Sequence, residues 1–115
     1  MTAGSVVLVA LPQADGASKN RPALVLGPVK PFGDLVVCGI STQVHLAVAG
    51  FDEVVDSGEP DFARSGLRGP SVIRLGYLAT LPLAGIKGRI GVIDPVRHRR
   101  LVRRLSELVA DFSEA

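Results

Sequence analysis

Short apolar runs separated by turn-forming residues constrain the fold of this chain more than any other feature of its sequence. Each run is rich in Val and Leu, and Gly, Pro, Asp or Asn lies between one run and the next, which is typical of successive strands. The predicted strands are Ser5–Leu11, Ala23–Leu26, Asp34–Ile40, Pro70–Leu75 and Lys87–Ile93. Gly, Pro and acidic residues interrupt residues 47–69, where we expect short strands at most. In the linker 76–85 we expect a single helical turn.

One amphipathic helix is predicted after the last strand. Asp94 can cap its N-terminus, and Pro95 suits its first position. The apolar residues that follow recur at spacings of three and four, and we expect them to pack on the sheet: Val102, Leu105, Leu108, Val109 and Phe112. Short strands followed by such a helix predict a mainly β fold, a small barrel that the helix closes or covers.

Length and composition indicate one domain over residues 1–115. The chain is 47% hydrophobic, and a domain of this size buries roughly two-thirds of its unfolded surface. The first apolar run follows no positive charge and is too short to span a bilayer, so we expect no signal peptide, no membrane helix and a cytoplasmic location. Cys38 is the only cysteine, and we expect it to be a buried strand residue rather than a nucleophile.

Charge is distributed unevenly although the net charge is only +2. Five of the eleven acidic residues lie between Asp52 and Asp61, and five arginines lie between Arg97 and Arg104. Such asymmetry can indicate a polyanionic partner, but a solvated helix face is the favoured interpretation of the arginine cluster. We expect these arginines to lie mostly on the faces of the helix that do not pack.

The sequence lacks the motifs of most common enzyme classes. His, Cys and carboxylate residues show no metal-ligand spacing, and neither a phosphate-binding Gly-rich loop nor a GxSxG motif is present. We therefore expect no metal and no other cofactor.

Polar residues follow the third predicted strand in the segment ISTQVH, residues 40–45. On local sequence alone they fit the exit turn of that strand. Strand alternation would instead put Ser41, Gln43 and His45 on one face of the sheet.

Arg21 is the second candidate, because it directly precedes Pro22 at the start of a predicted strand. A proline disfavours the helical region for the residue before it and is tolerated at a strand start. Arg21 should thus be held in an extended conformation beside the polar loop 12–20, where it can meet the hydroxyl of Ser41 in one groove.

The order of motifs along the chain resembles the MazF/PemK family of toxin ribonucleases. The motifs are GSVVLVALP, NRPALVLG, VVCGISTQ and GLRGPSVIRLGYLATLP, followed by a GRIG-type strand and a final helix. The resemblance covers nearly the whole chain, and residues 47–65 match least well. It implies an SH3-like barrel with a C-terminal helix, a homodimer, and metal-independent cleavage of single-stranded RNA at short sequences. It also implies a partner antitoxin whose tail occupies the RNA groove, and we expect that tail to be acidic.

The resemblance also implies roles for individual residues. Arg21 matches the conserved arginine of the family, and Ser41 matches its catalytic hydroxyl, which is usually a threonine. We predict these two residues as catalytic and the following as substrate-binding: Lys19, Asn20, Thr42, Gln43 and Arg74. Ser5 and Gly39 depart from the usual acid and proline of the family, and His45 is expected to be a groove-wall or surface residue.

This chemistry suits the residue types. Metal-free RNA cleavage uses the ribose 2′-hydroxyl as nucleophile, so the products carry a 2′,3′-cyclic phosphate and a 5′-hydroxyl. The protein must then stabilise the extra negative charge of a phosphorane, which an arginine does through bidentate hydrogen bonds. Two alternatives share the same fold: a module that binds without cleaving, and a toxin that targets gyrase.

Overall fold

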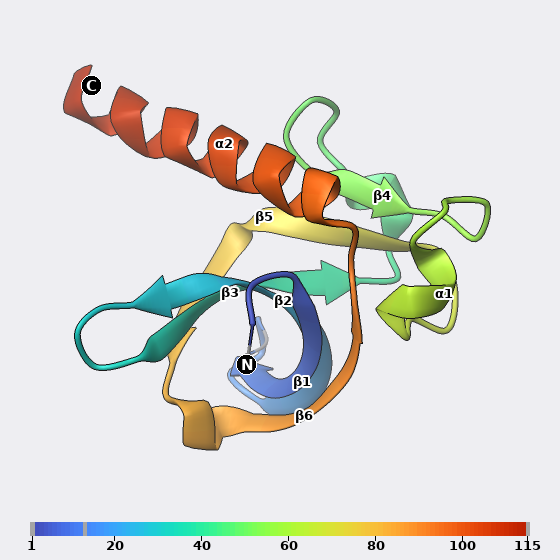
Figure 1. The fold of residues 1–115 in the computed structure, drawn as a ribbon, viewed down its shortest axis with the longest axis horizontal. Coiled ribbons are helices and arrows are strands. Elements are labelled where there is room, and N and C mark those ends of the chain that lie inside the picture. The colour runs from blue at the N-terminus through green and yellow to red at the C-terminus, as the bar shows by residue number, and fades with distance from the viewer. Residues whose placement is uncertain (1, 13, 115) are drawn as a thin grey trace.

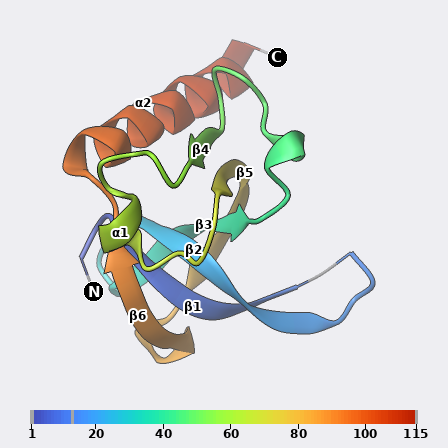
Figure 2. The same cartoon turned by 90° about the vertical axis from the view of Figure 1, so that its right-hand side faces the viewer.

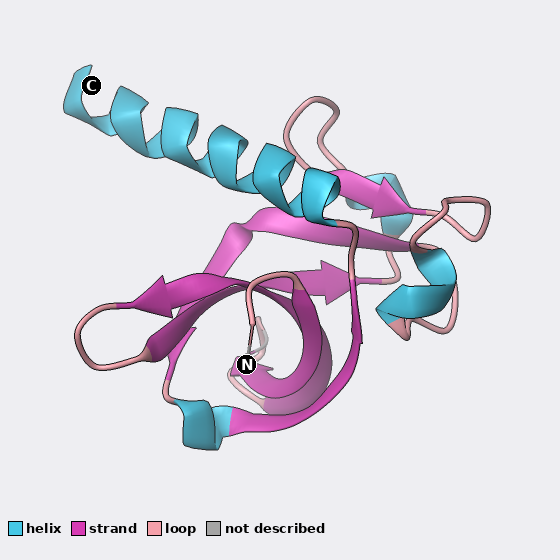
Figure 3. Cartoon of the chain, viewed as in Figure 1, coloured by secondary structure: helices cyan, strands magenta, loops and turns pink. Residues whose placement is uncertain are grey.

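The computed structural model describes residues 2–12 and 14–114, which form one antiparallel sheet followed by a long helix (Figure 1). The strands are β1 (Ser5–Pro12), β2 (Ser18–Val29), β3 (Asp34–Ser41), β4 (Glu53–Val55), β5 (Ser71–Leu81) and β6 (Ile86–Val92). The helices are α1 (Phe62–Ser65) and α2 (Pro95–Asp111), and the 3-10 turns are η1 (Val44–Leu46), η2 (Leu83–Gly85) and η3 (Phe112–Glu114) (Figure 3). The predicted mainly β fold with a C-terminal helix is confirmed.

The sheet has the strand order β4-β5-β3-β2-β1-β6 and curls strongly, as Figure 2 shows from the side. Its end strands are not joined by a ladder within the described residues, so the sheet is curled but not closed. Alternating residues supply two apolar clusters, one on each face. The cluster between the sheet and α2 includes Val6, Leu24, Cys38 and Ile73 of the sheet and Leu101 of the helix. The other face includes Val7, Val9, Ala23, Val25 and Val37.

Cys38 is fully buried in the cluster beneath α2. Burial, with a smaller contribution from the charge of Asp52, raises the pKa of its thiol to about 12. The thiol is therefore protonated at neutral pH, and the expectation of a buried strand residue is confirmed.

Two strands are longer than the sequence predicted. β2 begins at Ser18, because the polar residues 18–20 pair with β1 in an extended hairpin, so Pro22 lies inside β2 and not at its start. Pairing with β3 begins only at Ala23, which leaves Pro22 without a partner on that side. β5 continues to Leu81, so the first part of the linker 76–85 is strand, and the single helical turn predicted within the linker is found at η2. In both places, pairing with a neighbouring strand overrides the local composition.

The helix begins where the sequence predicted. The Asp94 carboxylate accepts a hydrogen bond of 2.8 Å from the Val96 backbone N–H, and Pro95 occupies the first helical position. Of the predicted apolar face, Leu105 packs partly buried against the core, whereas Val102, Val109 and Phe112 are exposed. The helix residue that is fully buried is Leu101, which the prediction did not include. The C-terminal half of α2 extends beyond the sheet, so it has no sheet surface beneath it (Figure 1).

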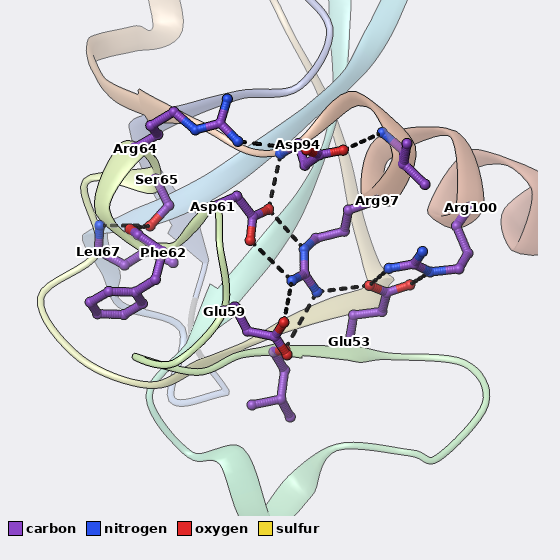
Figure 4. Close-up of polar contacts among 12 residues, drawn as sticks. Glu53, Glu59, Asp61, Phe62, Arg64, Ser65, Leu67, Asp94, Arg97 and Arg100 are labelled. Carbon is purple, nitrogen blue, oxygen red and sulfur yellow. Dashed lines mark hydrogen bonds and ion pairs between the residues drawn. The ribbon is translucent and has the colours of Figure 1, made fainter.

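The two charged clusters of the sequence bind each other. Arg97 is buried, and its guanidinium contacts Glu53 at 2.8 Å (Nη1 to Oε1) and Asp61 at 3.0 Å (Nε to Oδ2) and 3.1 Å (Nη2 to Oδ1) (Figure 4). Arg100 and Arg104 also contact Glu53, at 2.8 Å and 3.0 Å. Arg99, Arg100 and Arg103 are exposed, as expected for most of the cluster, whereas Arg97 is buried and Arg104 is partly buried.

These ion pairs predict a loss of stability in acid. Burial acts to raise the pKa values of Glu53 and Asp61, but hydrogen bonds and charges from Arg100, Arg97 and, for Asp61, the Asp94 backbone outweigh it, so both pKa values are lowered. A carboxyl whose pKa is lowered by folding stabilises the folded state above its unfolded pKa, and this contribution is lost as the pH falls through the folded value. We expect the urea midpoint to be level from about pH 8 to 6 and to fall below about pH 5. A midpoint that rises on acidification would contradict this prediction.

Close backbone contact between α1 and β6 gives a second stability prediction. A Cβ on Gly91 would lie 2.2 Å from the Ser65 carbonyl carbon, and one on Gly66 would lie 2.0 Å from the Ile90 oxygen. Because these neighbours are backbone atoms, Gly91→Ala should destabilise the protein by about 1–3 kcal/mol or more. Gly88→Ala, in the same strand, is the matched control. Apart from the two chain neighbours of Gly88, no described atom lies within 4 Å of the added Cβ. Equal urea midpoints for the two variants would refute the packing argument.

Candidate functional site

A cavity of about 210 Å³ lies at the end of β3 and is lined mainly by polar groups. Its lining consists of Leu11, Arg21, Gly39, Ile40, Ser41, Thr42, Gln43, Leu46, Arg74 and Tyr77. Five of the seven predicted site residues are therefore brought together: Arg21, Ser41, Thr42, Gln43 and Arg74.

Strand register explains why these residues meet. β2, β3 and β5 are neighbours in the sheet, and Gly39 in β3 is paired with Ala23 on one side and with Arg74 on the other. Continuing the β2–β3 register by two residues places Arg21 opposite Ser41. Both then project from the same face, beyond the end of the apolar cluster on that face.

The Arg21 side chain is exposed, and it makes no hydrogen bond or ion pair with the described residues. Such a group on a paired strand is available to bind an anion from outside.

The Ser41 hydroxyl oxygen accepts a hydrogen bond of 3.1 Å from the Gln43 backbone N–H. Its own O–H remains available to donate into the cavity. The chain turns here into η1, so strand alternation beyond Ser41 was the wrong prediction: Thr42 and Gln43 both line the cavity, and His45 does not.

Arg74 is held in place from behind by Asp52. Its Nε lies 3.7 Å from Asp52 Oδ2, and its guanidinium carbon lies 5.4 Å from the centre of the Tyr77 ring. The buried Asp52 carboxylate also accepts hydrogen bonds of 3.0 Å from the backbone N–H groups of Val48 and Leu75. Asp52 thereby joins the segment after η1 to β5.

Two predicted residues lie outside the cavity lining. Lys19 and Asn20 are exposed in the outer part of the β1–β2 hairpin, where they pair with Leu11 and Ala10. Alternation along β2 puts Lys19 on the same face as Arg21 and Asn20 on the opposite face. A role for either in binding stays a prediction.

Sequence reasoning did not find Asp52 or Tyr77. Asp52 belongs to a segment with many acidic residues, and nothing in the sequence distinguishes it from its neighbours. Tyr77 is the only tyrosine of the chain, but its position in the cavity depends on an irregularity in β5 that the sequence does not reveal.

Within residues 2–12 and 14–114, no group of three or more His, Cys, Asp and Glu residues is placed to hold a metal ion. No helix in the described part of the chain is long and apolar enough to cross a membrane.

Comparison with known proteins identifies the fold. The chain is similar to the Mycobacterium tuberculosis toxin MazF-mt6, with a TM-score of 0.62, 23% identity, and coverage of 90% of this chain and 93% of that one. Two crystal forms of MazE-MazF from Deinococcus radiodurans match with TM-scores of 0.65 and 0.68. Their identities are 18% and 20%, and the matches cover 95% and 96% of this chain and 94% and 96% of those chains. No curated protein sequence matches the chain.

A family model provides evidence that does not depend on these structures. The model for the PemK-like, MazF-like toxin of type II toxin-antitoxin systems matches residues 2–109, nearly the whole chain. The same span contains the curled sheet, most of α2 and every residue that lines the cavity. The chain therefore belongs to the PemK/MazF family of type II toxins.

Proposed function

We propose that this protein is a metal-independent, sequence-specific endoribonuclease that cleaves single-stranded RNA in the cytoplasm. The observation that carries the proposal is the cavity that combines the unpaired Arg21 with the free O–H of Ser41. Family membership supports it, because PemK/MazF toxins are generally RNA-cleaving.

In this reaction the ribose 2′-oxygen forms a bond to phosphorus, and the bond from phosphorus to the 5′-oxygen breaks. The 2′-hydroxyl loses its proton, and the departing 5′-oxygen gains one. The products carry a 2′,3′-cyclic phosphate and a 5′-hydroxyl. The phosphorane between them bears additional negative charge, and this charge is what the cavity must stabilise.

Arg21 supplies that stabilisation. An arginine side chain is already protonated in proteins and has no acceptor atom for a further proton, so its role is to donate hydrogen bonds to phosphate oxygens. Ser41 donates from its hydroxyl to the same phosphate, and the Gln43 N–H fixes the direction in which that hydroxyl can donate. Thr42, Gln43 and Arg74 line the remaining cavity and bind neighbouring parts of the strand.

The test is to incubate the purified protein with a long RNA of known sequence in EDTA and to map the ends of the products. We expect cleavage at one short sequence and the termini described above. Dependence on a divalent metal would refute the mechanism. Gyrase inhibition without RNA cleavage, or RNA binding without cleavage, would replace the proposed function with one of the two alternatives.

We also propose an antitoxin partner and a homodimer. The MazE-MazF structures from Deinococcus radiodurans are of complexes, and they resemble this chain over nearly its full length. A cavity that binds phosphates through Arg21 and Arg74 should accept an acidic peptide segment in the same place. A mass equal to one chain in light scattering at micromolar concentration would count against the dimer.

The charge of the inhibitor gives a further prediction. Binding between the cavity and an acidic antitoxin tail should weaken as salt is raised, because exposed charges are screened. Calorimetric titrations of the cognate tail peptide at low and high salt provide the measurement. A basic tail, or an affinity unchanged by salt, would place the inhibitor elsewhere.

A further inference from the structure

An irregularity in β5 brings an aromatic ring into the cavity. β3 pairs with β5 in one register up to Cys38 and Leu78, and in another from Gly39 and Arg74 onward. The three residues 75–77 of β5 therefore have no partner in β3. The Leu75 N–H that lost its place in the ladder donates instead to Asp52 Oδ1 at 3.0 Å. The buried carboxylate thus fixes the bulge that carries Tyr77.

The Tyr77 side chain contacts Gly39 and Arg74 and is still largely exposed. A Cβ added to Gly39 would lie 3.3 Å from Tyr77 Cδ2 and 3.5 Å from its Cβ, so the tyrosine rests on backbone that lacks a side chain. The Arg74 guanidinium lies 5.4 Å from the ring centre, and Asp52 holds that guanidinium. Tyr77 is nevertheless 57% exposed and lines the cavity. Its ring is held in place while much of its surface remains open.

A fixed, exposed aromatic ring beside phosphate-binding groups is suited to a nucleobase. Proteins that bind single-stranded RNA place unstacked bases on aromatic side chains while cationic groups hold the backbone. The cavity contains both kinds of group, with Arg21 and Ser41 on β2 and β3 and Tyr77 on β5. Phe32 is more exposed, at 88%, but it lies in the β2–β3 turn at the opposite end of β3.

We propose that Tyr77 is a base-stacking residue that binds the nucleobase next to the scissile phosphate, an inference that rests on the proposed RNA-cleaving function. The bulge at residues 75–77, Gly39 and Asp52 position the ring. Stacking selects for the presence and size of a base at that position. Arg74, which lies beside the tyrosine ring, can donate hydrogen bonds to the edge of the stacked base.

The experiment uses RNA strands that contain the mapped cleavage site. Each single strand has 2′-deoxyribose at the cleaved nucleotide, so that it binds without reacting. In one strand 2-aminopurine replaces the base on the 5′ side of the scissile phosphate, and in a second strand it replaces the base on the 3′ side. We expect the wild type and Tyr77→Phe to quench the fluorescence of 2-aminopurine at one of these positions. Tyr77→Leu should lose the quenching and bind about 5- to 150-fold more weakly, the range that corresponds to one stacked base.

Two controls separate stacking from damage to the fold. Phe32→Ala removes an exposed aromatic side chain far from the cavity and should bind as the wild type does. An abasic nucleotide at the quenched position should weaken binding by the wild type but not further weaken binding by Tyr77→Leu. Full quenching by Tyr77→Leu, or equal and independent losses from the abasic site and the substitution, would overturn the proposal.

Tyrosine emission separates this proposal from the proposed function. The chain contains one tyrosine and no tryptophan, so its emission comes from Tyr77 alone. If tyrosine emission decreases when single-stranded RNA binds but the protein cleaves no RNA, stacking is supported and the nuclease function is refuted. Cleavage with unchanged binding and quenching by Tyr77→Leu would refute stacking and retain the nuclease.

Discussion

Arg21→Ala should cleave RNA about a hundredfold to a thousandfold more slowly than the wild type, the usual effect of removing one preorganised donor to a developing charge. The structure gives the physical reason. Arg21 lines the cavity opposite Ser41 and has no partner among the described residues, so its charge is available to the phosphate. Single-turnover cleavage of an RNA with the mapped site provides the measurement.

Three further variants make this prediction specific. Arg21→Lys should recover only part of the rate, because a point charge cannot reproduce the planar arrangement of guanidinium donors. Ser41→Ala should be slower than the wild type but faster than Arg21→Ala, whereas Ser41→Thr should retain activity because it keeps the hydroxyl. Arg99→Ala removes the same charge from an exposed position on α2 and should cleave normally. Normal cleavage by Arg21→Ala would remove Arg21 from the mechanism.

Arg97→Ala should lower the free energy of unfolding by about 3–5 kcal/mol, the usual result of removing one partner from a buried ion pair. Asp61 is 1% exposed, and Arg97 makes two hydrogen bonds with it. Without Arg97, the Asp61 carboxylate would keep the hydrogen bond of 2.9 Å that it accepts from the Asp94 backbone N–H. Its negative charge would then be buried without an ion-pair partner among the described residues. Urea unfolding at pH 7 measures the change.

Arg103→Ala is the matched control, because Arg103 is an exposed arginine of the same helix. It should change the stability by less than about 0.5 kcal/mol. Adding Asp61→Asn to Arg97→Ala should restore part of the loss, since the unpaired charge is then removed. A loss below about 1 kcal/mol for Arg97→Ala would mean that the buried pairs contribute little to stability.

The fold was largely predictable because its strands and helix are determined locally. The runs around β1, β3 and β6 and the Asp94–Pro95 helix start contain their own signals, and the structure matches them closely. The long ends of β2 and β5 have no such signal, because they are extended only through pairing with distant strands. The ion pairs of Arg97 were missed for the same reason, since the two charged clusters are more than thirty residues apart in sequence.

The candidate site was predictable where it rests on motifs and strand parity. Arg21 and Ser41 were identified from sequence, and the register of β2 and β3 brings them to one cavity. Asp52 and Tyr77 were not identified, because their positions depend on the β5 bulge and on a carboxylate that reaches across the fold to Leu75. Periodicity says nothing about an irregularity of that kind.

The order of synthesis determines when the ion pairs between α2 and the acidic segment can form. Synthesis proceeds from the N-terminus, so Asp52, Glu53 and Asp61 are added to the chain before Arg97, Arg100 and Arg104. Asp52 supports Arg74 in the cavity, and its neighbour Glu53 is bound by α2. The nascent toxin therefore contains all of its cavity residues before it contains the arginines that fasten the segment behind them.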